Sequence, residues 1–299
     1  MAEAAAGGSG MIPPGFTGAG LDRADQLRVD AARLAEALAH AEAGVLAMQG
    51  LEPELDSAGR LVWSSVTGHS VERLILLGFD GEAPRFAPLG DVAPHGQAAM
   101  HLFKLISELD AREAAIWGAA RSLNEWHARH RFCGTCAAPT EPFRAGWGRR
   151  CDGCGAEAFP RVDPVVIMLA EHDGRVLVGR QHRYPPGRYS ALAGFVEPGE
   201  SIEEAVAREL FEEAGLRVEA VRYVTSQPWP FPYSLMMACV AHAEDGALTL
   251  DETEIEDAIW VDRAGVRAAL DADPDAPFQA PPPYAIAHSL LRWWVGQGG

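Results

Sequence analysis

Apolar residues along the 299-residue chain follow two spacings, and each spacing predicts one kind of element. The continuous apolar runs on either side of Asp173-Gly174 are typical of two buried strands joined by a hairpin turn. Similar runs predict strands at 71–79, 189–196, 218–225, 235–242 and 256–261. Apolar residues at every third or fourth position predict helices at 27–48, 98–109, 111–130, 202–214 and 284–296. This mixture of elements predicts an α+β fold.

The chain is long enough for about two domains, and its composition divides it into four segments. Residues 1–22 are rich in Gly, Ala and Pro and predict a flexible tail. Residues 23–127 form an N-terminal domain without a catalytic constellation of its own. Residues 128–160 hold two cysteine pairs, and residues 161–299 hold the hairpin and an acidic helix. We expect the last segment to be the catalytic domain.

The helix predicted at 202–214 is bounded by clear signals and is strongly acidic. Ser201 and Glu204 have the spacing of a capping box, and Gly215 is a typical C-terminal stop. Glu209, Glu212 and Glu213 share one face of this helix, because they are separated by three or four residues. Two interpretations are open: a solvated acidic face, or an all-oxygen site for a hard divalent cation such as Mg²⁺ or Mn²⁺.

Four of the five cysteines form two CxxC pairs with fourteen residues between them. Two such pairs at this spacing predict a closed tetrahedral zinc site, whereas two unrelated pairs of buried cysteines are the alternative. Four sulfur ligands leave no position for water, so the predicted zinc ion is structural. The predicted ligands are Cys133, Cys136, Cys151 and Cys154. The fifth cysteine, Cys239, lies in an apolar run and predicts a buried core thiol.

The formal charge of −17 argues against a sequence-independent grip on nucleic acid, which depends on Lys and Arg. Between Ala128 and Arg161, however, six arginines face three acidic residues. A ribbon with this local excess could also bind nucleic acid, which we rank second to the structural role; the residues to suspect are Arg131, Arg144, Arg149, Arg150 and Trp147. The chain shows neither a secretion signal nor an apolar run of membrane-spanning length, so we expect a cytoplasmic protein without membrane contact.

The segment Ser226–Met236 alternates three prolines with aromatic residues. This composition excludes a regular helix or a central strand, and we expect a stiff, extended loop. Such a loop can be a rigid connector whose rings fill core. It can also present flat rings to a base or a nicotinamide, with Gln227 and Ser234 hydrogen-bonding the ring edge or the ribose.

The acidic helix and the loop before it match the pattern GX5EX7REUXEEXGU residue for residue, at Gly194, Glu200, Arg208, Glu209, Leu210, Glu212, Glu213, Gly215 and Leu216. The chain therefore resembles the Nudix hydrolases, which implies a mixed α/β/α sandwich that holds metal ions against a nucleoside diphosphate. By this resemblance Glu209, Glu212 and Glu213 are catalytic metal ligands. The backbone carbonyl of Ala193 is a further contact, and Glu200 and Arg208 brace the loop and the helix.

The Cys₄ ribbon before the box and the SQPWPFPxS motif after it are similar to the NADH pyrophosphatase branch of that superfamily. The resemblance covers about residues 125–290 and implies substrate contacts from Phe159, Phe195, Ala287 and the motif residues Gln227, Pro228, Trp229, Pro230, Phe231, Pro232, Tyr233 and Ser234. Glu254 falls at a metal-binding position of the branch. Phe159 stands where the branch has a tyrosine, so a phenolic hydrogen bond is lost there. Without the resemblance, core packing is the better interpretation of Phe195.

The resemblance implies metal-assisted hydrolysis of the diphosphate of NADH or NAD⁺ to AMP and nicotinamide mononucleotide, with Glu213 or Glu212 taking the proton. It also implies removal of NAD caps from RNA and a homodimer. Two other readings remain open. One is a broader hydrolase of ADP-ribose or dinucleoside polyphosphates, against which only the aromatic loop argues. The other is a non-catalytic zinc-ribbon module that binds nucleotides or RNA, against which the three intact box glutamates argue.

Overall fold

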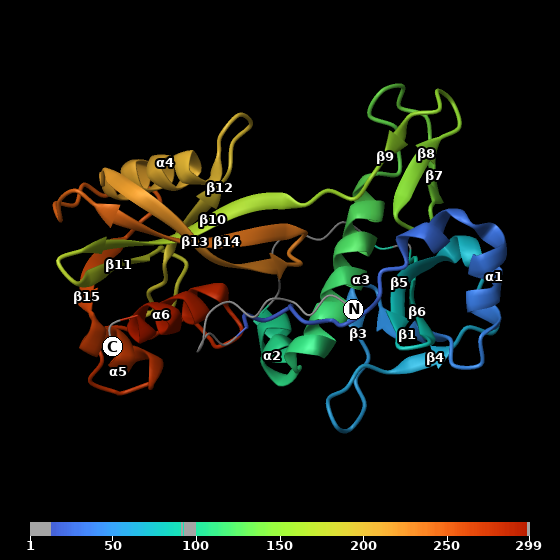
Figure 1. The fold of residues 1–299 in the computed structure, drawn as a ribbon, viewed down its shortest axis with the longest axis horizontal. Helices are drawn as coiled ribbons and strands as arrows, with labels where there is room; N and C mark the ends of the chain where they lie inside the picture. The colour runs from blue at the N-terminus through green and yellow to red at the C-terminus, as the bar shows by residue number, and fades with distance from the viewer. Residues whose placement is uncertain (1–12, 91, 93–99, 298–299) are drawn as a thin grey trace. The chain divides into compact units, whose positions relative to one another are not determined.

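The computed structural model describes residues 13–90, 92 and 100–297 of the chain (Figure 1). Contacts divide the chain into two compact units. The N-terminal unit comprises Phe16–Val162 together with Pro228–Ser234, and the C-terminal unit comprises Met1–Gly15, Asp163–Gln227 and Leu235–Gly299. Most of the tail predicted at 1–22 lies outside the described residues. None of the helices in the described part of the chain has the length and apolar content that a membrane span requires.

The N-terminal unit contains a four-stranded sheet, three helices and a small ribbon (Figure 1). The sheet has the order β4-β1-β6-β5, and its core includes Val45, Leu74, Leu76 and Phe86. The elements before the ribbon are η1 (Asp25–Val29), α1 (Ala31–Ala39), β1 (Gly44–Leu46), β2 (Met48–Gln49), β3 (Glu52–Pro53), β4 (Trp63–Ser65), η2 (Val71–Arg73), β5 (Leu74–Asp80), β6 (Ala83–Pro88), α2 (Met100–Glu108) and α3 (Ala111–Arg129). The strand predicted at 71–79 is confirmed from Leu74 onward, whereas Val71–Arg73 form η2. The helices predicted at 98–109 and 111–130 are confirmed over Met100–Glu108 and Ala111–Arg129, and residues 98 and 99 lie outside the described residues.

The prediction of one helix over 27–48 is wrong in its second half. Asp30 caps α1 by accepting hydrogen bonds from the backbone N–H groups of Ala32 and Arg33, and the helix ends at Ala39. The chain then enters β1, which pairs with β4 on one side and with β6 on the other. Three buried residues in a doubly paired strand gain more from the sheet than from continuing an isolated helix.

The ribbon follows α3 and is a three-stranded antiparallel sheet in the order β7-β8-β9. Its strands are β7 (Thr140–Phe143), β8 (Gly148–Cys151) and β9 (Glu157–Ala158). The β7–β8 turn packs on the larger sheet of the same unit, where the N–H of Leu76 donates to the carbonyl of Ala145 at 3.0 Å. A Cβ on Gly146 would lie 2.7 Å from Ile75, so this contact requires glycine.

The C-terminal unit is one mixed sheet with helices on both faces (Figure 1). Its strand order is β13-β14-β10-β11-β15, and β12 pairs with β10. The elements are β10 (Asp163–His172), β11 (Arg175–Arg180), β12 (Leu192–Phe195), α4 (Ile202–Ala214), β13 (Val218–Trp229), β14 (Ser234–Ala243), β15 (Asp257–Asp262), α5 (Arg263–Leu270) and α6 (Ile286–Gly296).

Alternate residues of the central strands enter two separate cores. Ile167 and Leu169 of β10 pack with α5 and α6, whereas Val166 and Met168 pack with α4. This explains the unbroken apolar runs, since a strand covered on both faces has no polar side. The predicted α+β class, the α/β/α sandwich, the hairpin around Asp173-Gly174 and the helix at 284–296 are confirmed; α5 was not predicted.

The structure also corrects the loop predicted at Ser226–Met236. Strand β13 continues through Trp229, and β14 begins at Ser234, which leaves only a tight turn between them. Strand β13 lies at the edge of its sheet, where Pro228 removes no hydrogen bond that the sheet needs. The prolines of this segment exclude a central strand, but they are compatible with an edge strand.

Candidate active site and zinc site

Helix α4 begins and ends as the sequence predicts. Ser201 accepts a hydrogen bond from the backbone N–H of Glu204, whose side chain accepts one from the N–H of Ser201. Gly215 ends the helix in the left-handed conformation, with φ of 73°. The helix buries Val206 and Leu210 against the sheet. Residues that lie between these two in the sequence face the loop that precedes α4.

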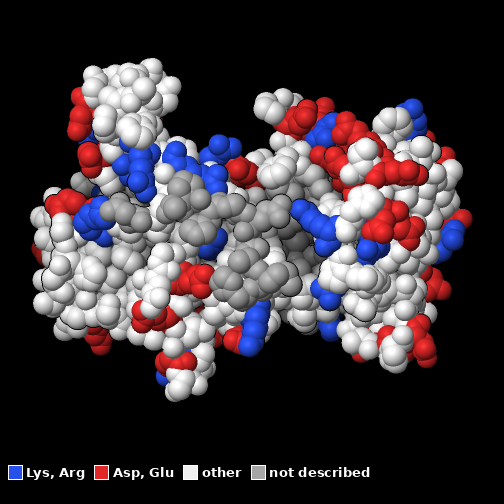
Figure 2. Space-filling view, turned by 180° about the vertical axis from the view of Figure 1, so that it is seen from behind, with Lys and Arg blue, Asp and Glu red and all other residues white. Residues whose placement is uncertain are grey.

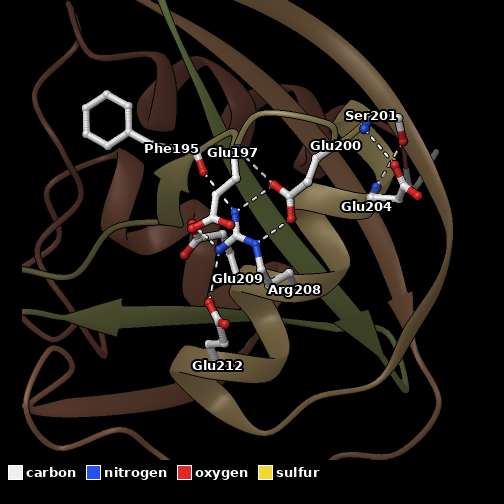
Figure 3. Close-up of polar contacts among 8 residues, drawn as sticks. All are labelled: Phe195, Glu197, Glu200, Ser201, Glu204, Arg208, Glu209 and Glu212. Carbon is white, nitrogen blue, oxygen red and sulfur yellow. Dashed lines mark hydrogen bonds and ion pairs between the residues drawn. The ribbon is translucent and has the colours of Figure 1, made fainter.

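Arg208 connects the helix to this loop (Figure 3). Its Nε and Nη2 donate to the two carboxylate oxygens of Glu200 at 2.6 and 2.9 Å, and Nη2 also donates to the carbonyl of Phe195 at 2.9 Å. Its Nη1 donates to Glu209 at 2.8 Å and to Glu212 at 3.0 Å. The expected Arg208–Glu212 pair is thus present. One guanidinium holds three carboxylates, which fixes the loop and the helix in one arrangement.

These ion pairs shift the pKa values of both partners. The hydrogen bond from Arg208 lowers the pKa of Glu200 to about 2. The pKa of Arg208 is raised, first by Glu200 and then by Glu209 and Glu212, against the effect of burial. Glu200 therefore stays ionised, and Arg208 neutralises its charge. The role of Glu200 is to brace the loop against the helix.

Gly194 of β12 lies directly against the carboxylate of Glu209. A Cβ at this position would lie 1.9 Å from Cδ of Glu209, so the carboxylate can occupy its place only beside a glycine. Strand β12 pairs Gly194 with Val166 of β10, so the sheet fixes its place. The glycine of the sequence motif is explained by this close approach, which lets a helix carboxylate rest on strand backbone.

Glu213 is the most buried carboxylate of the group, with 3% of its surface exposed. Its Oε2 has no hydrogen-bond partner among the residues that the structure describes. Burial raises its pKa to about 8, and the charges of Glu209, Glu254, Asp251 and Glu212 add to the shift. Burial likewise raises the pKa of Glu209, although Arg208 opposes this effect. Several carboxylates therefore face one another with too little positive charge between them.

A loop before β15 brings Glu254 to the helix. The N–H of Asp251 donates to the carbonyl of Glu213 at 3.0 Å, and the N–H of Glu254 donates to the carbonyl of Asp251 at 3.1 Å. His182 holds the same loop through Nε2, 2.9 Å from the carbonyl of Glu252. Glu254 lies in this loop, three residues before β15 begins at Asp257. Sequence reasoning missed Asp251 and His182, since neither belongs to a motif.

The residues fit a divalent cation with oxygen ligands. A buried carboxylate oxygen without a partner among the described residues, next to three further carboxylates, is the donor set that such a cation requires. Four glutamates are the candidate ligands: Glu209, Glu212, Glu213 and Glu254. Among the described residues these carboxylates do not converge as the four cysteines do, and two of them, Glu209 and Glu212, pair with Arg208. The structure does not test the predicted contact of the Ala193 carbonyl.

The four predicted zinc ligands come together in the ribbon. In the described part of the chain they form the only group of three or more His, Cys, Asp or Glu whose ligand atoms all lie within 4.8 Å of one another. Sγ of Cys136 lies 3.4 Å from Sγ of Cys151, and no disulfide is formed. Backbone N–H groups of Cys136 and Thr135 lower the pKa of Cys133 to about 6. Four converging thiols with amide support fit a zinc ion.

The predicted substrate segment Pro228–Ser234 is held by α3 within the N-terminal unit. Arg121 donates from Nε to the carbonyl of Pro230 at 2.9 Å and lies over the ring of Phe231, and Ser122 donates to the carbonyl of Pro232 at 3.1 Å. The rings of Trp229 and Phe231 pack edge-on against Phe16. The segment is therefore rigid, and part of its aromatic surface fills core.

Gln227 makes structural contacts within the C-terminal unit. It is fully buried, its amide nitrogen donates to the carbonyls of Gly15 and Tyr284, and its oxygen accepts from the N–H of Ile286 at 2.8 Å. This last bond satisfies a free N–H in the first turn of α6, next to buried Ala287. A substrate contact from Gln227 or Ala287 remains a prediction.

The two other predicted ring contacts lie at the surface. Phe195 is 60% exposed and points away from the carboxylates (Figure 3), so the core-packing interpretation of this residue is wrong. Phe159 is 53% exposed and lies 5.9 Å from the ring of Phe143. Both rings are free to stack on a ligand, and that role stays a prediction.

Two family models match the chain: the NUDIX domain over residues 160–280 and the NADH pyrophosphatase zinc ribbon domain over residues 128–159. The chain is 46% identical over 198 residues to the NAD-capped RNA hydrolase NUDT12 of Macaca fascicularis, which covers 63% of this chain and 43% of that protein. It is 39% identical over 207 residues to the mitochondrial NAD(P)H pyrophosphatase NUDT13 of Homo sapiens, covering 66% and 59%.

A third relative, the NAD-capped RNA hydrolase NudC of Salmonella heidelberg, is 35% identical over 205 residues, covering 69% of this chain and 76% of that protein. The match thus spans less than half of the NUDT12 relative and about three quarters of NudC. The sheet lies between helices, and the acidic helix α4, which Arg208 braces, packs on strand β12. Together with the match to the NUDIX domain, this arrangement is that of a Nudix hydrolase. The chain belongs to the Nudix hydrolases that carry the NADH pyrophosphatase zinc ribbon, the family of NudC.

Proposed function

We propose that the chain hydrolyses the diphosphate of NADH or NAD⁺ to nicotinamide mononucleotide and AMP, with Mg²⁺ or Mn²⁺. The observation that carries this proposal is the buried Glu213, which has an oxygen without a described partner and faces Glu209, Glu254 and Asp251. Relatives named NAD(P)H pyrophosphatase and NAD-capped RNA hydrolase support the choice of substrate.

The chain's own residues divide the work between binding and proton transfer. Glu209, Glu212, Glu213 and Glu254 would hold the cation, which supplies charge neutralisation at the diphosphate and acidifies the attacking water. Arg208 keeps Glu209 and Glu212 in place through direct hydrogen bonds. Glu213 or Glu212 accepts the proton of the water as its oxygen bonds to phosphorus and the bond to the bridging oxygen breaks.

Substrate selection is assigned to Pro228–Ser234 and to the exposed rings of Phe159 and Phe195. The hydrogen bonds from Arg121 and Ser122 fix the segment before any ligand binds, so little conformational entropy is lost on stacking. This rigid aromatic surface favours a dinucleotide over ADP-ribose, which lacks the nicotinamide ring.

The same diphosphate joins an NAD cap to RNA, and we include cap removal in the proposed function. The relatives named NAD-capped RNA hydrolase support this extension. We also propose a homodimer in the cytoplasm, where a reducing environment keeps the four ribbon cysteines available for zinc.

Substituting Glu213→Gln tests the proposal. Loss of this carboxylate removes both a cation ligand and a candidate base, so kcat for NADH should fall by about 10³-fold or more. AMP release measures the rate, and circular dichroism should show an unchanged fold. Glu203→Gln, which changes an exposed glutamate of the same helix, is the matched control and should keep the wild-type rate. A near-normal kcat for Glu213→Gln would contradict the assignment.

A further inference from the structure

A cavity of about 340 Å³ lies in the N-terminal unit, between helix η1 and the ribbon hairpin. Its lining combines cationic and apolar groups: Arg28, Val29, Phe143, Arg144, Arg150 and Glu157. None of these residues belongs to the Nudix box, to the cysteine site or to the segment Pro228–Ser234. A space-filling view shows Lys and Arg gathered around the base of the lobe that carries the ribbon, in a chain of strongly acidic composition (Figure 2).

Arg28 is the most buried cation of this cavity, with 8% of its side chain exposed. Its guanidinium stacks on the ring of Trp147 at 3.8 Å, and Nη2 donates to the carbonyl of Arg23 at 2.9 Å. Its ion pair with Asp25 is long, at 3.4 Å. Nε is buried and has no hydrogen-bond partner among the described residues. The side chain is fixed in place, and its hydrogen-bonding capacity is only partly used.

Two further guanidinium groups act on Arg28. Arg144 donates to Asp25 at 2.9 Å, and Arg23 lies 5.9 Å from the ring of Trp147 that Arg28 covers. Burial lowers the pKa of Arg28, and the charges of Arg23 and Arg144 oppose the favourable effect of Asp25. Arg28 and Arg144 thus share the carboxylate of Asp25, and Arg23 adds a third positive charge near Arg28; an anionic ligand would relieve the repulsion among these cations.

The opposite wall of the cavity offers a flat surface beside a fourth cation. Arg150 lies over the ring of Phe143 at 4.6 Å and donates from Nε and Nη2 to Glu157 at 3.0 and 2.7 Å. The exposed ring of Phe159 lies beside the ring of Phe143, with 5.9 Å between the ring centroids. Three arginines of the lining against the carboxylates of Asp25 and Glu157, beside the half-buried ring of Phe143, match the needs of a single-stranded nucleic acid, whose phosphates and bases alternate.

We propose that this cavity binds the body of a single-stranded RNA, with a phosphate held by Arg28 and Arg144 and a base stacked on Phe143. The inference rests on the proposed removal of NAD caps, and it assigns the part of the RNA that follows the cap. An acidic peptide would use the cations but would leave the ring of Phe143 without a stacking partner, so RNA fits the whole cavity better.

The test uses the full-length protein with Arg144 and Arg150 both changed to Gln. Its matched control is Arg60→Gln, because Arg60 belongs to the same unit and donates to Asp56 from the same two nitrogens, Nε and Nη2. Fluorescence anisotropy with an uncapped, unstructured RNA measures binding without turnover. AMP release from NADH and from the same RNA carrying an NAD cap measures activity.

We expect the double variant to bind the RNA about tenfold more weakly, with a dependence of log Kd on log salt that is shallower by about 1–1.5. Its kcat/KM should fall for capped RNA and stay unchanged for NADH, whereas Arg60→Gln should match the wild type. Changing both arginines to Lys keeps the charge and should restore part of the binding; this also separates loss of contact from a folding defect.

RNA binding by the double variant equal to that of Arg60→Gln would overturn the proposal. Displacement of the RNA by polyglutamate at equal charge concentration would also overturn it, because the cavity would then be a general anion site. Failure of the wild type to hydrolyse NADH would reject the proposed function instead, since the anisotropy result for uncapped RNA stands independently of turnover.

Discussion

The absence of a side chain at Gly194 makes room for the carboxylate of Glu209. The two residues are fifteen positions apart, and only the packing of α4 on β12 brings them together. Arg208 holds the other side of the same carboxylate at 2.8 Å. Glu209 is therefore placed by backbone on one side and by a cation on the other, which leaves it little freedom to adjust.

Substituting Gly194→Ala should displace Glu209 without unfolding the protein. The new methyl group would occupy the position of the carboxylate, and a misplacement of about 1 Å in catalytic machinery can cost about 100-fold in rate. We expect kcat for NADH to fall by about this factor, with an unchanged circular dichroism spectrum. Gly296→Ala, in the same unit with nothing within 4 Å, should keep wild-type activity. Equal rates for the two variants would show that Glu209 can move freely.

The sequence predicted these residues but not most of their partners. Arg208–Glu212 follows from helical spacing, whereas the stronger contacts of Arg208 to Glu200 and to the carbonyl of Phe195 depend on the path of a loop. Gln227 shows the same limit, because its partners at Gly15 and Tyr284 are distant in sequence. A motif identifies which residues matter, and long-range packing decides what each one touches.

At the scale of elements, His127 joins the end of α3 to the ribbon hairpin. Its Nε2 donates to the carbonyl of Gly146 at 2.8 Å, and its Nδ1 accepts from Arg149 at 3.0 Å. The bond from Arg149 requires a neutral imidazole, because Nδ1 must accept. Burial lowers its pKa from 6.5 to about 4, and the charge of Arg149 adds to the shift. Protonation would break the bond to Arg149 and place two cations side by side.

This junction should weaken in acid. Between pH 6.5 and pH 4, His127 is protonated in the unfolded chain but neutral in the folded protein. The contribution of His127 to the free energy of unfolding is therefore complete above pH 6.5 and is lost as the pH falls toward about 4. We expect the wild type to lose about 2 kcal/mol of unfolding free energy between pH 7 and pH 5 that His127→Gln does not lose. Urea unfolding of the full chain, followed by circular dichroism, measures this difference.

The control for this experiment is His69→Gln, because His69 is exposed in the same unit. It should keep the wild-type pH dependence, whereas His127→Gln, whose amide can replace both hydrogen bonds, should show a flatter one. An identical pH dependence in all three proteins would exclude His127 as the responsible group. Working with differences between variants removes the contribution of the ribbon thiols, which titrate in every protein.

Elements with a strong local pattern were predicted correctly, and elements decided by their neighbours were not. Strands β10 and β11 and helix α4 have apolar periodicity and defined ends. The stretch 27–48 has a helical composition, but its second half forms a strand because β4 and β6 pair with it. Strand β13 runs through Pro228 because it lies at a sheet edge. Neither outcome is encoded within the segment itself.

At the scale of the whole molecule, the segment Pro228–Ser234 belongs by its contacts to the unit that holds the cysteine site, although the sequence places it among the strands of the other unit. The candidate catalytic carboxylates belong to the C-terminal unit. The candidate catalytic carboxylates and the proposed substrate segment therefore belong to different units. If the proposed role of this segment holds, the N-terminal unit takes part in substrate binding.

Loss of zinc should consequently affect more than the ribbon. In Cys136→Ser one of four thiols that lie within 4.8 Å of one another is lost, and structural zinc sites contribute about 10–16 kcal/mol of apparent binding free energy in small domains. We expect the zinc content to fall from one ion per chain to a small fraction, with a lower thermal midpoint. KM for NADH should rise more than kcat falls, because the ribbon shares its unit with Pro228–Ser234, and added Mg²⁺ or Mn²⁺ should not restore it.

Cys239→Ala separates this effect from a general loss of thiols. Cys239 is buried in the other unit, and its pKa is raised to about 11 by burial, so it contributes no thiolate to a metal. Its substitution should leave the zinc content at one ion per chain and leave KM unchanged. A full zinc complement in Cys136→Ser would reject the four-cysteine site. Zinc loss with an unchanged KM would instead show that the ribbon and the substrate segment are independent, although they share one compact unit.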